Sequence, residues 1–253
     1  MVPADIISGN FAKFLMILLR TSVFLAFLPI LGSTSLPGRF RIGLAIGFAA
    51  LLTPIVEMRA GGDDVAILIF REVIFGMVLG LAVRFIFLGI EMGGQKISES
   101  MGLSIATVFN PEFGQISGVS QFLAILSTLL FLAMDCHHDM IALFVRSYDL
   151  APFGTSDPGA LVNEGIALMG RIFVITIKVA APIVIGTVTL NILLGFIVKA
   201  TPQINIFFIG LPLYICFGFA IIMLALPAYI VLIGGSFSEI RIEMARIIGI
   251  AGR

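Results

Sequence analysis

Residues 65–90 read VAILIFREVIFGMVLGLAVRFIFLGI, an apolar run that only three charged residues interrupt. A helix needs about 20 mainly apolar residues to cross a bilayer, so this run is long enough to span a membrane. Five further apolar runs are candidate spans: residues 11–31, 42–56, 122–134, 166–198 and 204–233. Along the chain, the second and fourth of these six runs are short and the fifth is long. The pattern predicts an all-α, polytopic membrane protein with about six hydrophobic helices.

The composition supports the same fold class. Of the 253 residues, 59% are hydrophobic and 12% are charged, and the mean hydropathy is +1.15. Soluble domains are about 45–50% apolar and roughly 25% charged, so this chain lacks the polar surface to coat a globule. The excess apolar surface must face lipid or other subunits. The formal net charge is +0 and no basic stripe is present, which argues against a nucleic-acid partner.

Three prolines fall inside the last two apolar runs: Pro182, Pro212 and Pro227. Proline is tolerated in a spanning helix where neighbouring groups satisfy the carbonyls that it frees. We therefore expect bent or broken helices that pack as a subunit of a larger assembly. No second domain is visible, so residues 1–253 are predicted to form a single domain that ends in an amphipathic tail, residues 234–253.

Basic side chains lie inside several of the apolar runs. Arg20 and Lys178 lie deep within their apolar runs, and Arg71 lies nearer to the end of its run. A charge at the centre of a spanning helix costs at least about 2.5–3.5 kcal/mol unless it pairs or reaches the interface. We expect Arg20 and Lys178 to pair with groups inside protein. For Arg71, extension toward the interface is an equally good prediction.

Enzyme signatures are weak. The densest set of possible metal ligands is DCHHD, residues 135–139. Successive helical side chains point about 100° apart, and zinc sites space their ligands by two or more residues, so His137 and His138 are not expected to face one ion. No nucleophile elbow, phosphate-binding loop or dinucleotide fingerprint occurs. We predict no enzymatic activity, no cofactor and no metal, and we expect Cys136 and Cys216 to be buried free thiols.

A transporter of small solutes or ions in the inner membrane is the alternative function for a chain with six spans. Coupled transporters usually carry acidic or histidine side chains within their spans. Glu72 and Glu91 lie at the ends of apolar runs instead, and internal repeats, another transporter signature, are not evident. These observations weaken the transporter hypothesis without removing it.

Four ordered segments resemble one family, the FliR family of bacterial type III export gates. The first segment, residues 20–41, contains PILGSTSLP; the second, residues 93–111, runs from GGQ through MGLS to FNP. The third, residues 130–154, runs from LFL through HH to PFG. The fourth, residues 190–213, contains KATPQINIF and then GLPL, and PQINIF is its most specific part. Asn110 stands where family members often have aspartate, and Asp135-Cys136 where many have Asn-Gly.

The resemblance implies a core subunit of the flagellar export channel, in the bacterial inner membrane at the flagellum basal body, with counterparts in injectisomes. It implies a helical ring with FliP- and FliQ-family subunits around a narrow pore for unfolded export substrates, near FlhA- and FlhB-family components. Bent apolar helices would then pack on other subunits, and charges within the spans would pair inside the complex.

The resemblance also implies that the loop at residues 101–118 helps to plug the closed channel. Its composition suits that role because glycines give the backbone freedom and apolar side chains exclude water from a constriction. The candidate plug residues are Met101, Leu103, Ile105, Val108 and Phe109. Without the resemblance, a plain connector that packs on the membrane surface would be the better interpretation.

A second candidate element is the turn that carries PQINIF. A proline ends the preceding helix there, and side-chain amides can cap or bridge neighbouring helix ends. We expect this turn to hold two spans in register, with subunit contact as a consequence. Its candidate residues are Pro202, Gln203, Asn205 and Phe207.

Overall fold

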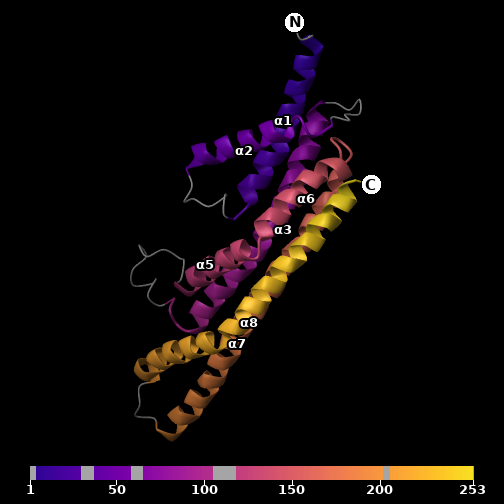
Figure 1. Ribbon diagram of the computed structural model, residues 1–253. Coiled ribbons are helices and arrows are strands. Elements are labelled where there is room, and N and C mark those ends of the chain that lie inside the picture. Colours follow the sequence, from indigo (N-terminus) through magenta and orange to yellow (C-terminus); the bar gives the residue numbers. More distant parts are fainter. Residues whose placement is uncertain (1–3, 30–36, 58–64, 105–117, 202–205, 253) are drawn as a thin grey trace. The chain divides into compact units, whose positions relative to one another are not determined.

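The computed structural model describes residues 4–29, 37–57, 65–104, 118–201 and 206–252, and no strand occurs in these ranges (Figure 1). The all-α prediction is therefore confirmed. The described helices are α1 (Ala4–Phe27), α2 (Gly38–Leu52), α3 (Val65–Ser100), α5 (Gly118–Ala133), α6 (Cys136–Leu150), α7 (Pro158–Ala200) and α8 (Ile206–Ala251).

Four of the described helices are long and apolar enough to cross a membrane: α1, α3, α7 and α8. Helices α5 and α6, separated only by Met134 and Asp135, would make a fifth span if they are taken together. Helix α2 has 15 residues. At 1.5 Å per residue it is about 22 Å long, which is less than the roughly 30 Å hydrocarbon core. The polytopic prediction is confirmed, with the run at 42–56 too short to count among the spans.

The chain divides into two compact units. The first contains Met1–Phe85, Asp135–Gly170 and Phe237–Arg253, and the second contains Ile86–Met134 and Arg171–Ser236. Three helices, α3, α7 and α8, each contribute residues to both units.

In the first unit, glycines of α3 let α1 approach closely. A Cβ at Gly76 would lie 2.8 Å from the backbone oxygen of Arg20, and one at Gly80 would lie 2.7 Å from Cβ of Phe27. Small residues four apart allow this kind of contact between apolar helices. Phe24 of α1 stacks on Phe144 of α6, with ring centroids 4.4 Å apart.

In the second unit, a second glycine pair on α3 receives α7. A Cβ at Gly89 would lie 2.9 Å from Cβ of Ile175, and one at Gly93 would lie 2.6 Å from Cγ1 of Val179. Thr176 donates its hydroxyl to the Gly89 carbonyl at 3.1 Å. The Tyr229 hydroxyl of α8 in turn donates to the Val179 carbonyl at 3.0 Å. Hydrogen bonds between helices thus accompany the close packing.

The helices differ strongly in how much of their surface the chain itself covers. The most apolar stretch of α3 is 67% buried, whereas those of α7 and α8 are each 17% buried. Pro182 lies inside α7, and Pro212 and Pro227 lie inside α8, which changes direction in its first half (Figure 1). Cys136 is buried, but Cys216 on α8 is exposed. The prediction for Cys216 was wrong because so little of α8 is covered.

Candidate functional site

The most constrained polar group in the described chain is the Arg20–Glu72 ion pair of the first unit. Arg20 on α1 and Glu72 on α3 both have no exposed surface. The Nε atom of Arg20 lies 2.5 Å from Oε2 of Glu72, and its Nη2 lies 3.0 Å from Oε1. Two parallel bonds of this kind match the fork of a guanidinium to both oxygens of a carboxylate. The prediction that Arg20 pairs inside protein is confirmed.

The remaining donors of Arg20 hold the end of α6. Nη1 lies 3.4 Å from the carbonyl and 3.3 Å from the hydroxyl of Ser147, and Nη2 lies 3.2 Å from the carbonyl of Ala151. The Ser147 carbonyl also accepts the backbone N–H of Ala151, at 3.0 Å, so Arg20 is a second donor to it. A cation at the C-terminal end of a helix also interacts favourably with the helix dipole. Arg20 therefore caps α6 from a neighbouring helix.

Aromatic rings enclose the same guanidinium. Its central carbon lies 4.6 Å from the ring centroid of Phe75, 4.3 Å from that of Tyr148 and 5.4 Å from that of Phe153. A guanidinium over the face of such a ring is attracted by the ring's quadrupole, most strongly where water is excluded. The rings thus supply favourable contact on the sides of Arg20 that make no hydrogen bond.

The loop between α6 and α7 is fastened to α3 through Gly154. The backbone N–H of Gly154 donates to Oε1 of Glu72 at 3.4 Å, and Arg71 donates to the Gly154 carbonyl. Gly154 has φ 80°, a left-handed conformation that suits glycine. Together, Arg20, Glu72, Arg71 and Gly154 join α1, α3 and the end of α6. We call these four residues the buried clamp.

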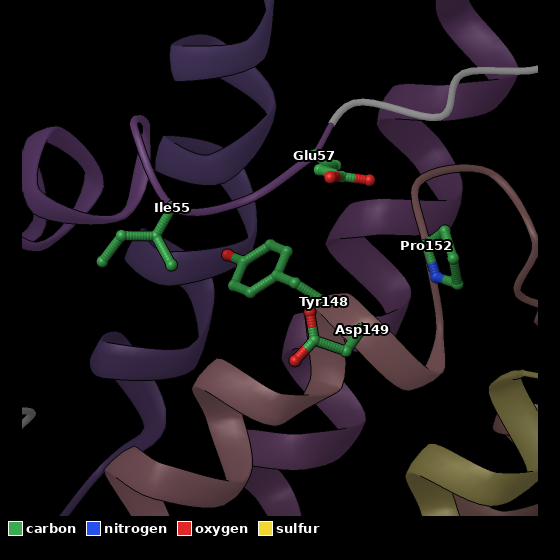
Figure 2. A pocket seen from close by; sticks show the side chains of 5 residues that line it. All are labelled: Ile55, Glu57, Tyr148, Asp149 and Pro152. Carbon is green, nitrogen blue, oxygen red and sulfur yellow. The ribbon is translucent and has the colours of Figure 1, made fainter.

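A small cavity of about 240 Å³ lies beside the buried clamp in the same unit. Figure 2 shows its five lining residues, with the Tyr148 ring directed toward Ile55 and away from Pro152; Glu57 and Asp149 complete the set. The Tyr148 hydroxyl is 3.5 Å from the Ile17 carbonyl of α1. Tyr148 is therefore shared by the cavity wall and the aromatic surroundings of Arg20.

Of the five candidate plug residues, the structure places two. Met101 directly follows α3 and is fully buried in the second unit, where a Cβ built on Gly218 of α8 would lie 2.5 Å from its Cγ. Leu103 is half-buried. Ile105, Val108 and Phe109 lie outside the described residues.

The PQINIF turn falls mostly outside the described chain. Pro202, Gln203 and Asn205 are outside the described residues, and Phe207 belongs to the first turn of α8. Further along the two helices, the Tyr214 hydroxyl of α8 donates to the side-chain oxygen of Asn191 on α7. The two helices are thus joined by a polar contact.

Two further predictions concern the partner of Lys178 and the directions of the two histidines. Lys178 is exposed on α7, and no residue in the described ranges pairs with it, so its predicted partner is not found there. Asp135, His137 and His138 lie close enough that one ligand atom from each falls within 4.8 Å of the others. The expected divergence of the two histidine side chains is therefore not observed.

Sequence reasoning missed Glu72 as the partner of Arg20, because it placed Glu72 at the end of an apolar run. A signal was available: Glu72 follows Arg71 on the same run as Gly76 and Gly80, whose four-residue spacing is typical of close helix packing. Both carboxylate oxygens of Glu72 are engaged, so this buried acid does not resemble a free coupling site of a transporter.

Comparison with known proteins places the chain among bacterial export proteins. Residues 11–240 match the family described as bacterial export proteins, family 1. The chain is 26% identical over 251 residues to the flagellar biosynthetic protein FliR of Bacillus subtilis, covering 96% of each chain. It is 28% identical over 240 residues to the FliR of Escherichia coli, covering 91% of this chain and 90% of that one. With the FliR of Caulobacter vibrioides it shares 29% identity over 217 residues, covering 82% and 85%.

Proposed function

We propose that the chain, which belongs to the FliR family of bacterial export proteins, is a core channel subunit of the export gate. The family match makes it a component of the flagellar export apparatus. In this role it helps to form and seal the pore through which unfolded export substrates pass. The observation that carries the proposal is the family match, which spans residues 11–240 of a multi-pass helical chain.

The partners proposed for the chain are FliP- and FliQ-family subunits, with FlhA- and FlhB-family components nearby. The support is the poor coverage of α7 and α8, whose most apolar stretches are each only 17% buried. A spanning helix in lipid gains little from burial as such, but close packing on another helix is favourable. Lys178, exposed on α7, is then expected to meet a carboxylate of a neighbouring subunit in the assembled ring.

Residues 1–253 act in this proposal as one subunit domain. The support is that α3, α7 and α8 each run through both compact units, so neither unit is a separable stretch of sequence. The buried clamp fixes the geometry of the first unit, which then serves as a frame for assembly. It is a structural device, because every hydrogen-bonding direction of the Arg20–Glu72 pair is directed at protein.

The loop at residues 101–118 is proposed to seal the closed pore, with Met101, Leu103, Ile105, Val108 and Phe109 as its apolar surface. The support is the buried contact of Met101 with Gly218, which fixes one end of the loop to α8. The turn with Pro202, Gln203, Asn205 and Phe207 is proposed to hold α7 and α8 in register and to contact a neighbouring subunit. We place the protein in the inner membrane, at the flagellum basal body.

Deletion of the gene in its own bacterium tests this function. We expect flagellar assembly and swimming to be lost while the uptake of small solutes is unchanged, and a plasmid copy should restore both flagella and swimming. Normal flagella in the deletion strain would contradict the proposal. Coupled solute transport by the purified chain in liposomes would support the transporter hypothesis instead.

A further inference from the structure

Asp135, His137 and His138 form a compact group at the beginning of α6. One ligand atom from each side chain lies within 4.8 Å of the other two. Nδ1 of His138 is 3.4 Å from Oδ1 of Asp135. The ring centroids of His137 and His138 are 4.1 Å apart, with planes tilted by 36°. These residues play no part in the buried clamp or in the loop proposed to seal the pore.

The local backbone explains why adjacent histidines converge here. Asp135 precedes α6 in a left-handed conformation, with φ 54°. The helix therefore starts with Cys136, and the backbone N–H of His138 donates to the Asp135 carbonyl at 2.9 Å. The chain bends by 66° between α5 and α6, and the side chain of Asp135 meets that of His138 in the first helical turn. Rotation of the two imidazoles removes the divergence that a regular helix would impose.

We propose that Asp135, His137 and His138 form a binding site for a divalent transition-metal ion, with Zn²⁺ as the best-matched ion. Imidazole nitrogen and carboxylate oxygen are ligands of tetrahedral Zn²⁺ at about 2.0–2.2 Å. Ligand atoms at that distance are about 3.4 Å apart around the ion, which is the separation already present between His138 and Asp135. The ligand atom of His137 lies within 4.8 Å of the other two, and its side chain must rotate to bring that atom to the same spacing.

Asp135 and His138 are exposed and leave room for a fourth ligand, while His137 is half-buried. The side chains of His138 and Asp135 are 72% and 74% exposed. Zinc sites that are not closed by four protein ligands usually have three, with water in the fourth position. Imidazole with carboxylate disfavours Mg²⁺ and Ca²⁺, which take oxygen ligands, and favours Zn²⁺, Ni²⁺ or Cu²⁺.

The surrounding charges determine how tightly the site is expected to bind the metal ion. Asp139, one turn further along α6, pairs with Arg241 of α8 at 3.4 Å, so these two opposite charges largely offset each other. The carboxylate of Asp135 supplies a negative charge next to both imidazoles, while the positive end of the α6 dipole opposes a cation. We therefore expect binding that is weaker than in closed structural zinc sites with four protein ligands. A bound ion would fasten the start of α6 to the residue that precedes it.

The test uses the full chain, purified in detergent through a tag that contains no histidine. The sequence has 2 histidines, His137 and His138, so any imidazole-dependent binding is theirs. We measure Zn²⁺ retained after dialysis at micromolar free Zn²⁺, and the visible spectrum with Co²⁺, which reports tetrahedral coordination. We expect one Zn²⁺ per chain and an intense Co²⁺ band.

Three variants identify the ligands: His137→Ala, His138→Ala and Asp135→Asn. Asparagine tolerates the left-handed backbone, so Asp135→Asn removes the charge and keeps the turn. Each variant should weaken Zn²⁺ binding by about tenfold or more. The controls Cys216→Ser and Asp149→Asn, both exposed positions, should retain the bound ion. Substoichiometric Zn²⁺ in the unaltered chain, or Zn²⁺ that survives both histidine variants, overturns the proposal.

Discussion

Arg20 of α1 has no exposed surface, and every direction of its guanidinium meets protein. A buried ion pair of this kind contributes little net stability, because the desolvation of both charges offsets their attraction. Removal of one partner is a different matter, since it leaves the other as a buried charge without compensation. At the scale of single residues, the buried clamp is therefore a device that fixes geometry.

Glu72→Gln is expected to lower the free energy of unfolding by about 3–5 kcal/mol, because Arg20 loses its counter-charge. The double variant Arg20→Met with Glu72→Leu should lose less stability than either single variant, Arg20→Met or Glu72→Leu, since no charge remains buried. Denaturant titration of the purified chain in detergent measures these variants and Glu72→Gln.

The matched control is Glu99→Gln, which removes one partner of the exposed Lys96–Glu99 pair, 2.7 Å apart. Exposed pairs are worth at most about 1 kcal/mol, so this change should be small. A double variant as unstable as the sum of the two single variants would show that Arg20 and Glu72 are not coupled.

Gly218→Val is expected to destabilise the chain by about 1–3 kcal/mol, because the new side chain occupies the space of the Met101 side chain. In a Met101→Ala background the same substitution should cost much less. Gly235→Val on the same helix is the control, since nothing lies within 4 Å of a Cβ there. Thermal unfolding of the unaltered chain, the three single variants and the double variant measures the coupling, and equal costs of Gly218→Val in both backgrounds would contradict the contact.

The pairing of Arg20 could be predicted from its depth in an apolar run, but its partner could not. Hydropathy places Glu72 near the end of a run, whereas burial depends on which helices surround it. Lys178 lies as deep in its apolar run as Arg20 does, so the same pairing was predicted for it. In the described chain, however, Lys178 is exposed and has no partner. A buried charge can be predicted from one helix, while its counter-charge requires the packing of several.

At the scale of elements, α3 organises the chain through two glycine pairs with the same four-residue spacing. Gly76 and Gly80 receive α1 in the first unit, and Gly89 and Gly93 receive α7 in the second. Without side chains at these positions the backbones approach closely, and dispersion contacts and hydrogen bonds stabilise the pairs. This accounts for the burial of 67% in the most apolar stretch of α3.

Gly76→Ala is expected to destabilise the chain although alanine favours helix more than glycine, because its Cβ would lie 2.8 Å from the Arg20 carbonyl oxygen. Gly47→Ala on α2 is the control, since nothing lies within 4 Å of its Cβ. That change should be neutral or should stabilise by up to about 1 kcal/mol. Unfolding of both variants in detergent measures the difference, and similar effects would argue against close α1–α3 packing.

Phe109→Ala, or deletion of residues 104–109, is expected to make the assembled channel leak, because a smaller apolar surface excludes water less well from a constriction. Assembly should survive, since a loop contributes little to helix packing. Ion permeability of cells that make the complete export gate measures the effect, and cells that make this chain alone provide the baseline. A tight channel in an intact deletion complex would reduce the loop to a connector.

The helices themselves could largely be predicted from apolar periodicity and run length. The run at 42–56 became a helix of 15 residues, too short to be counted as a span, since hydropathy detects apolar segments and not their final length. The convergence of His137 and His138 could not be predicted, because it depends on the left-handed backbone of Asp135. Sequence patterns describe regular helices well and their irregular ends poorly.

At the scale of the whole molecule, the chain leaves large apolar surfaces uncovered on α7 and α8. Exposed side chains there include Phe173, Ile177, Ile185, Phe196, Phe219 and Leu224. Lipid can cover such surfaces, but lipid would leave Lys178 in an apolar setting at a cost of at least about 2.5–3.5 kcal/mol. The proposal that neighbouring subunits cover these helices, and that one of them supplies a carboxylate to Lys178, accounts for both features.

Native mass spectrometry of the complex purified through a tag on this chain tests the central claim most directly. We predict one assembly whose mass requires FliP- and FliQ-family subunits together with this chain. A Lys178→Ala variant should recover less of that assembly, while Arg146→Ala, at an exposed position of α6, should not reduce it. A mass equal to this chain alone or to a multiple of it, from cells that produce all three proteins, would contradict the account.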